Sequence, residues 1–132
     1  MIYLAIHSGD TPVTGIKKIS SELAIPAPFL AKILQVLARH KLLQSSKGPN
    51  GGFKLGREAG KITLYEIVTV MDGNDIFEKC LISIRTCNEE NIPCPLHHKY
   101  EGLRNEIKQL FQQQDLGNLA WDIKAQQKIY AL

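Results

Sequence analysis

The amino-acid sequence predicts a mainly α-helical fold that carries one small β-ribbon. Apolar residues recur at helical spacing over residues 11–25, 28–43 and 95–114, and a glycine-rich run at 48–52 separates two short stretches typical of strands. Of the 132 residues, 44% are hydrophobic and 22% are charged, so the chain can bury one modest core. No apolar run approaches the roughly 20 residues of a membrane span, so we expect a cytoplasmic protein without a membrane partner.

The first predicted helices are short. The opening run MIYLAIHS has no capping residue before it, as if a helix were entered partway along. A second helix, which Thr14 can cap, is followed by a third helix with Pro28 in its first turn. The apolar stripe of the second helix is Ile16, Ile19, Leu23 and Ala24. The stripe of the third helix is Leu30, Ile33, Leu34 and Leu37.

The stretch LLQSSKGPNGGFKL that follows predicts a β-hairpin. Asn50-Gly51 favours a tight turn in which both central residues take positive φ. Helix, helix and ribbon in this order are the elements of a winged helix-turn-helix, a fold that reads DNA, and we expect it to occupy residues 1–73. An ordinary helix pair followed by a hairpin is the alternative, since a fold alone does not fix a function.

Further helices are predicted towards the end of the chain. Thr63 and Glu66 form a capping box, and the helix they start ends at Gly73 and buries Met71. Residues 95–132 then predict a long dimerisation helix and a short closing helix from Asn118, whose Trp121 completes the packing. The long helix carries a coiled-coil seam at Leu96, Tyr100, Leu103, Ile107 and Leu110.

The seam predicts a homodimer, because the chain has no second long helix to cover it. The alternative is that the seam packs on its own domain. The charge distribution points to a different partner for the first part of the chain. Residues 1–60 carry a net charge of +5 and residues 61–132 a net charge of −2, so the basic part suits the phosphates of nucleic acid, although a solvated basic face fits the charge equally well.

Several residues in the basic part are candidates for contact with DNA. The third helix would offer to the major groove the side chains that the core does not use. The glycines of the ribbon tip permit close approach to the sugar-phosphate backbone, and two lysines of the second helix suit phosphates. Each lysine taken alone also fits a solvated surface charge. The candidates are Lys17, Lys18, Ala27, Pro28, Phe29, Ala31, Lys32, Gln35, Lys47, Gly48, Asn50, Gly51 and Gly52.

All three cysteines lie in one segment, at Cys80, Cys87 and Cys94, and His97 follows the last of them. Cytosolic thiols stay reduced, so clustered cysteines are ligands or redox sensors rather than disulfides. A loop over residues 74–98 can bring three thiolates and one imidazole together, a donor set that fits an iron–sulfur cluster or a tetrahedral zinc ion. Uncoordinated thiols are the third possibility. His98 is expected to point away, because adjacent helical residues differ by about 100°.

The sequence resembles the winged-helix transcription regulators of the IscR, NsrR and CymR family. The resemblance lies in AIHSGDTPVTGIKKISSELAIPAPFLAKILQVLARHKLL, SSKGPNGGFKLGR, ITLYEIVTVMDG, the cysteine loop and LGNLA. It implies a homodimer on a partly palindromic double-stranded DNA operator, with the long helix crossing over its partner and Lys47 in the minor groove. Relatives typically begin about ten residues earlier, so we expect the start of the first helix to be missing here.

The resemblance also implies a [2Fe–2S] cluster on Cys80, Cys87, Cys94 and His97, which can be absent from isolated protein. In some relatives the cluster senses nitric oxide, and in some a carboxylate from the first helix is the fourth ligand. The cysteines here are separated by six residues, against five in IscR-like members. The signal to which the cluster would respond is the redox state, the iron–sulfur status or nitric oxide.

Two other classes of function fit parts of the sequence. A catalytic Cys94–His97 pair would make the chain an enzyme, but the sequence offers neither a third catalytic group nor a phosphate-binding glycine loop, so we expect no enzyme and no small-molecule substrate. A winged helix that binds protein instead of DNA, or a regulator that works without a cluster, remains an alternative.

Overall fold

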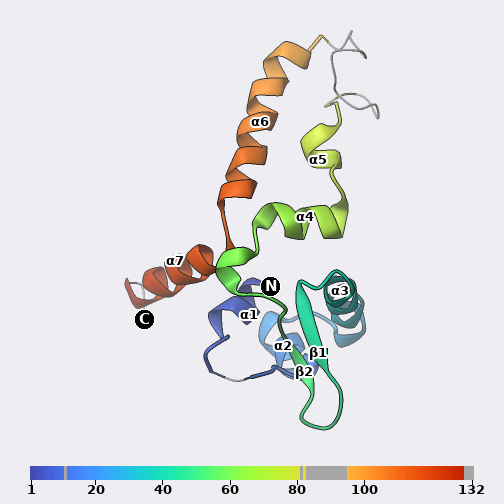
Figure 1. The fold of residues 1–132 in the computed structure, drawn as a ribbon, viewed down its shortest axis with the longest axis vertical. Coiled ribbons are helices and arrows are strands. Elements are labelled where there is room, and N and C mark those ends of the chain that lie inside the picture. The colour runs from blue at the N-terminus through green and yellow to red at the C-terminus, as the bar shows by residue number, and fades with distance from the viewer. Residues whose placement is uncertain (11, 81, 83–94, 130–132) are drawn as a thin grey trace.

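The computed structural model describes residues 1–10, 12–80, 82 and 95–129 (Figure 1). It is mainly helical with one two-stranded antiparallel sheet, which confirms the predicted fold class. The elements are α1 (Ile2–Ile6), α2 (Ile16–Leu23), α3 (Ala27–Arg39), β1 (Leu43–Ser46), β2 (Gly52–Leu55), a 3₁₀ turn (Ala59–Lys61), α4 (Leu64–Asp72), α5 (Asp75–Glu78), α6 (His97–Gln113) and α7 (Leu116–Ile129).

The molecule has two ends of different construction. Helices α1 to α3 and the β-ribbon gather at one end, which we call the helix–ribbon unit (residues 2–55) (Figure 1). Helices α5 and α6 extend away from it as an arm, and α4 lies between the two (Figure 1). Helix α7 returns to pack against α1 and the 3₁₀ turn. The tip of the ribbon therefore lies at the end of the molecule opposite the start of α6 (Figure 1).

The core lies in the helix–ribbon unit and under α7. Helix α3 faces inward with Leu30, Leu34 and Leu37, as its spacing predicts. Two backbone hydrogen bonds connect the chain at the start of α7 to the chain at the start of α4. The Leu116 N–H donates to the Ile62 carbonyl at 2.9 Å, and the Leu64 N–H donates to the Gln114 carbonyl at 2.9 Å. The remaining buried apolar residues are Leu4, Ala5, Ile19, Leu42, Leu43, Ile62, Phe77, Leu116 and Ala120.

The start and end of α2 differ from the prediction. Thr14 does not cap α2; its backbone pairs with Phe53 of β2 by two hydrogen bonds of 2.9 Å, and Gly15 occupies the cap position. The first helix of the pair is thus tied directly to the ribbon. At the other end Ala24 adopts the left-handed conformation at φ 53°, which ends the helix. Leu23, placed in the apolar stripe by its spacing, is exposed instead.

The ribbon closes differently from the predicted two-residue Asn-Gly turn. The strand register pairs Ser46 with Gly52, so the tip has five residues, 47–51. Gly48 takes positive φ at 102°, whereas Asn50 and Gly51 do not, and the prediction for them is wrong. A side chain at Gly52 would collide with the backbone of Thr14, because the extended chain before α2 crosses β2 at this point. The glycine has a packing role that spacing did not suggest.

Helix α4 begins and ends as predicted. The N–H of Glu66 donates to the Thr63 hydroxyl at 3.2 Å, and the Glu66 carboxylate accepts from the Thr63 N–H at 3.2 Å, which is a complete capping box. Gly73 ends the helix with φ 77°. Met71 is exposed, which contradicts its predicted place in the core, because α4 is the last helix before the chain turns into the arm.

Aromatic contacts join the arm to α4. The Phe77 ring of α5 lies 4.9 Å from the Tyr65 ring of α4 and 5.6 Å from the Phe111 ring of α6, measured between centroids. The ammonium of Lys108 lies 5.9 Å from the centroid of Tyr65. Helix α4 in turn packs against α3. A continuous line of contacts therefore runs from α6 to α3.

The closing helix also departs from the prediction. It begins at Leu116 rather than Asn118, because the Asp115 carboxylate accepts a hydrogen bond from the Asn118 N–H at 2.8 Å and caps the helix from further back. Trp121 is 71% exposed, so among the described residues it does not complete the packing as predicted. In the part of the chain that the structure describes, no single helix is long and apolar enough to cross a membrane; α2 and α3 meet the criteria only as a pair bent by 116°.

Candidate nucleic-acid interface and metal-ligand segment

The outer face of α3 presents most of the predicted DNA contacts. Pro28, Phe29, Lys32 and Gln35 are exposed, while the leucines between them face the core. Their positions on the first two and a half turns correspond to the part of a recognition helix that enters the major groove. Ala27 and Ala31 are half-buried beside them. This face offers a cation, an amide and an aromatic ring, each able to contact a base edge or a phosphate.

Phe29 is the apolar member of this face. Its side chain is 60% exposed in the first turn of α3. The sequence left open whether this ring is partly buried, and the structure shows that it is accessible. An exposed aromatic ring at this place can contact the methyl group of thymine, which marks one base pair in the major groove.

The ribbon and α2 surround α3 with further positive charge. Lys47 and Asn50 are exposed at the ribbon tip, and Lys17 and Lys18 are exposed on α2. Over residues 12–57 the chain holds eight Lys and Arg and a single acidic residue, Glu22. Gly48 is exposed at the tip, whereas Gly51 is half-buried and Gly52 is buried. Of the three predicted glycines, Gly48 is therefore the one open to a partner, and the other two serve the hairpin.

One electrostatic interaction fixes the exit of the ribbon. Arg57 donates to the carboxylate of Glu66 at 2.9 Å. Burial alone would raise the pKa of the Glu66 carboxyl, but the hydrogen bonds from Arg57 and from Thr63, together with the charge of Arg57, outweigh burial and lower that pKa. The chain after β2 is thereby attached to the first turn of α4.

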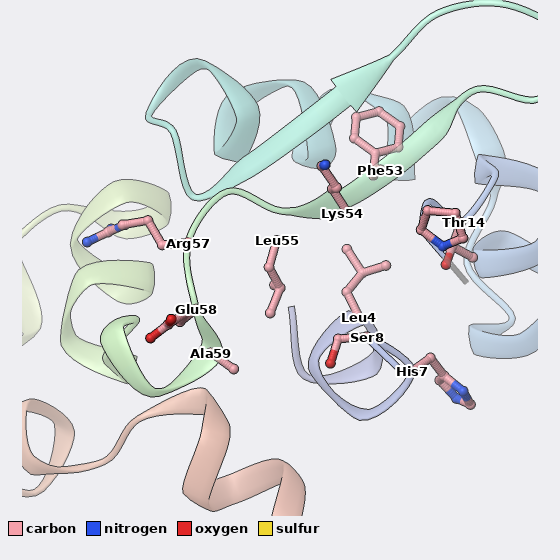
Figure 2. A pocket seen from close by; sticks show the side chains of 11 residues that line it. Leu4, His7, Ser8, Thr14, Phe53, Lys54, Leu55, Arg57, Glu58 and Ala59 are labelled. Atoms are coloured by element: carbon pink, nitrogen blue, oxygen red, sulfur yellow. The ribbon is translucent and has the colours of Figure 1, made fainter. Parts of the chain in front are cut away.

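A hollow of about 370 Å³ lies between α1 and β2 (Figure 2). Leu4 and Leu55 occupy its middle, whereas the guanidinium of Arg57 and the imidazole of His7 point away from it (Figure 2). Ligand pockets combine an apolar lining with polar groups that converge on the ligand. The residues labelled in the view do not show such convergence.

Two of the four predicted metal ligands lie among the described residues. Cys80 follows α5 and is half-buried, and His97 is the first residue of α6 with only 4% of its surface exposed. Cys87 and Cys94 lie outside the described residues. Helix α5, which ends two residues before Cys80, packs against α6, which begins with His97. A half-buried thiol and a buried imidazole fit a soft metal centre by donor type and burial.

Sequence reasoning missed a second grouping around His97. Nitrogen atoms of His97 and His98 and a carboxylate oxygen of Glu101 all lie within 4.8 Å of one another. The two rings meet edge to face with centroids 5.1 Å apart, although His97 is buried and His98 is exposed. That only one of them faces the cysteine segment stays a prediction, because most of this segment lies outside the described residues. The spacing His-His-x-x-Glu on a helix was the available signal, since residues i and i+4 share a face.

A buried arginine on the same helix was also missed. Arg104 is 6% exposed, and its Nε and Nη1 have no hydrogen-bond partner in the part of the chain that the structure describes. It lies seven residues after His97, on the same side of α6. A guanidinium in this situation is costly, because its lost hydration is not replaced.

Comparisons with known proteins agree with this architecture. Residues 1–122 match the Rrf2 family, described as iron-dependent transcriptional regulators. The chain is a transcription regulator with a winged helix-turn-helix. It belongs to the Rrf2 family of DNA-binding regulators and is related to IscR and CymR, which also confirms the expectation that it is not an enzyme.

Sequence relatives span different shares of the chain. An HTH-type transcriptional regulator of Aquifex aeolicus is 35% identical over 112 residues, which are 84% of this chain and 76% of the relative. IscR of Sodalis glossinidius is 32% identical over 80 residues, or 61% of this chain and 48% of that protein, so the match spans about half the length of that relative. IscR of Photobacterium profundum is 27% identical over 96% of this chain and 72% of its own.

Solved structures share the fold. CymR of B. subtilis, the global cysteine regulator, superposes with a TM-score of 0.73 at 24% identity, covering 90% of this chain and 85% of its own. IscR of T. potens gives a TM-score of 0.73 at 23% identity and covers 96% of this chain and 81% of its own. At these identities the likeness concerns the arrangement of helices and ribbon.

Proposed function

We propose that the protein acts in the cytosol as a homodimer that recognises a specific double-stranded DNA operator. The observation that carries this proposal is the exposed face of α3, with Phe29, Lys32 and Gln35, next to a ribbon whose tip carries Lys47. A helix for the major groove and a basic ribbon for the adjoining groove are the two parts of a winged DNA reader. In this proposal residues 1–73 bind DNA and residues 95–132 dimerise.

The dimer would bury the outer face of α6. Leu103, Ile107 and Leu110 are exposed there, at spacings of four and three residues. Three exposed apolar side chains in one row on a helix form a seam that a second helix can cover. Two copies of α3 would then face two half-sites of the operator, so the distance between the recognition helices would depend on how the two α6 helices meet.

Operator affinity in this proposal depends on an iron–sulfur cluster, of the [2Fe–2S] type, held by Cys80, Cys87, Cys94 and His97 on the segment 74–98. Such a group changes charge and stability with the redox state, the iron supply or nitric oxide, which makes it a sensor. The half-buried Cys80 and the buried His97 support it. A zinc ion or uncoordinated thiols on the same residues form the alternative, a regulator that works without a cluster.

Residues of the chain offer a route from this segment to the DNA. Helix α5, which leads to Cys80, contacts α4 and α6 through Phe77. Helix α4 packs on α3, so a shift of α5 reaches the recognition helix through side chains already in contact. By linkage, a ligand that favours one position of α5 changes the affinity for DNA to the same extent that DNA changes the affinity for the ligand.

Binding to DNA is tested with Lys47→Ala. If the Lys47 ammonium pairs with one phosphate, the slope of log affinity against log salt concentration should flatten by about one unit, because fewer counterions are released on binding. Lys124→Ala, at an exposed lysine on α7 outside the helix–ribbon unit, is the matched control and should leave the slope unchanged. An unchanged slope for Lys47→Ala would remove the ribbon from the interface.

The cluster is tested by anaerobic purification and reconstitution, followed by visible absorption and assays of iron and acid-labile sulfide. The protein should carry both, and Cys80→Ser should lose both while keeping its helical circular dichroism. A colourless protein with zinc and no sulfide would replace the cluster by a zinc site.

A further inference from the structure

The first turn and a half of α6 carries three side chains of types that bind metal ions, and one of them, His97, also belongs to the ligand set of the proposed cluster. His97, His98 and Glu101 present two ring nitrogens and one carboxylate oxygen within 4.8 Å of one another. Nε2 of His97 and Oε2 of Glu101 lie 3.5 Å apart. Two imidazoles and one carboxylate are a donor set that binds Zn²⁺ and Fe²⁺ and leaves further positions for water.

Burial gives these three side chains different roles. His97 is 4% exposed, so its ring is held in place by the surrounding protein, whereas His98 is exposed and the Glu101 side chain is 43% exposed. Ligands at about 2.1 Å from one ion lie no more than about 4.2 Å apart. The three donor atoms lie within 4.8 Å of one another, which exceeds this limit by less than about 1 Å. Rotation of the accessible side chains of His98 and Glu101 can bring the atoms closer.

The carboxylate of Glu101 supplies the negative charge that a cation needs at this end of α6. The N-terminal end of a helix carries a partial positive charge that repels cations, and the anionic Glu101 one turn later offsets this repulsion. His98 and Glu101 face solvent in part, so an ion and its waters have access from outside. The buried His97 supplies a rigid anchor, which reduces the ordering cost of binding.

We propose that His97, His98 and Glu101 form a mononuclear site for a divalent transition-metal ion, Zn²⁺ or Fe²⁺, with water completing the coordination. The site does not require a cluster, but it shares His97 with the cluster of the proposed function. One ring nitrogen coordinates one metal centre at a time. The mononuclear ion and the cluster therefore exclude each other at His97, and a chain without a cluster is the form that binds the ion.

The test removes the thiolates and keeps the full chain. In the variant Cys80→Ser, Cys87→Ser, Cys94→Ser, titration with Co²⁺, followed by its visible absorption and by displacement with Zn²⁺ or Fe²⁺, should show one site per chain. Adding His98→Ala or Glu101→Gln should weaken binding at least about tenfold, because even the loss of an outer-shell partner of a ligand weakens metal binding by that much. Glu106→Gln, an exposed carboxylate on the same helix, is the matched control and should change nothing.

Two outcomes would overturn the site: the triple variant, folded by circular dichroism, binds none of the three ions, or His98→Ala and Glu101→Gln bind as tightly as their parent. A separate measurement on chains with all cysteines distinguishes this from the cluster. His98→Ala should keep its iron and sulfide, whereas His97→Ala should lose both. Absence of sulfide in the reconstituted parent would reject the cluster alone, while ion binding by the triple variant would still stand.

Discussion

The helix–ribbon unit buries its apolar side chains, whereas the arm leaves an apolar row exposed. In the unit, α3 buries Leu30, Leu34 and Leu37 against neighbouring elements of the same chain. In the arm, Leu103 and Leu110 on α6 are 57% and 56% exposed. The unit therefore buries its apolar residues in a core that α7 helps to close, whereas the arm presents an apolar row that the described residues of one chain leave exposed. An exposed apolar row of this kind is typical of a surface that binds a partner.

Polar residues show the reverse contrast. On α3, Lys32 and Gln35 lie on the surface, while on α6 the buried residues are His97 and Arg104. Buried polar groups cost free energy of folding unless they are paired. A region that keeps them inside while leaving leucines outside is not optimised for the stability of a single chain, which is typical of regions selected for function.

The largest change in stability is expected when a leucine is replaced by alanine in the helix–ribbon unit, and the same substitution in the arm is made for comparison. Leu34→Ala should lower the free energy of unfolding by about 3 kcal/mol at every protein concentration, because it leaves a cavity in the core. Leu110→Ala should act through self-association alone, so its effect should depend on concentration. Urea denaturation at two concentrations a hundredfold apart measures both. Equal, concentration-independent decreases would mean that the arm is covered by its own chain.

The second prediction concerns the exposed row directly. Leu103→Asp with Leu110→Asp should weaken self-association at least about a hundredfold, or about 2.7 kcal/mol, because two charges would have to be buried in the seam. Sedimentation equilibrium measures the change. Asn105→Asp with Gln112→Asp, at exposed polar positions of α6, is the control with the same added charge. If both pairs weaken association equally, net charge rather than the seam is responsible.

A smaller effect is expected at the buried arginine. Arg104→Met keeps the length of the side chain and removes a guanidinium whose Nε and Nη1 have no partner among the described residues, so it should raise the free energy of unfolding by about 1 kcal/mol. Thermal and urea unfolding of the metal-free protein measure the change. A decrease in stability would show instead that an anionic group pairs with Arg104.

The smallest effect concerns pH. The pKa of Glu66 is lowered in the folded state, chiefly by hydrogen bonds from Arg57 and Thr63 that outweigh its partial burial. A lowered folded-state pKa stabilises the protein above the unfolded value, near 4.5, and that contribution is lost as the pH falls through the folded value. Because the pair is more than a third exposed, the contribution should be well under about 1 kcal/mol.

The pH effect is read from unfolding at pH 7 and below pH 4 in the parent and in Glu66→Gln. The free energy of unfolding should change less between the two pH values in Glu66→Gln than in the parent. Glu58→Gln, whose carboxylate lies 3.7 Å from the Lys61 ammonium in an exposed pair, is the control and should behave as the parent. Identical pH profiles for the parent and Glu66→Gln would remove the carboxylate from the stability balance.

The sequence by itself determined the elements whose signals are local. The capping box of Thr63 and Glu66, the stop at Gly73 and the inward leucines of α3 were all predicted, because hydrogen bonds within one turn and a 3.6-residue period are written in neighbouring residues. The outer face of α3, and with it the candidate DNA contacts, followed from the same period. The cysteine spacing predicted metal ligands in one segment but did not define how these ligands are arranged in space.

Only the tertiary structure decided what depends on distant partners. The strand register set the five-residue tip in place of an Asn50-Gly51 turn, and the backbone of Thr14 made Gly52 obligatory. Trp121 and Met71 have side chains typical of a core, but the described residues leave both of them exposed. His98 and Glu101 join His97 because rotamers, which spacing does not specify, direct their ends to one point. Burial and convergence are properties of the whole packed chain, whereas helical period and capping are properties of a few adjacent residues.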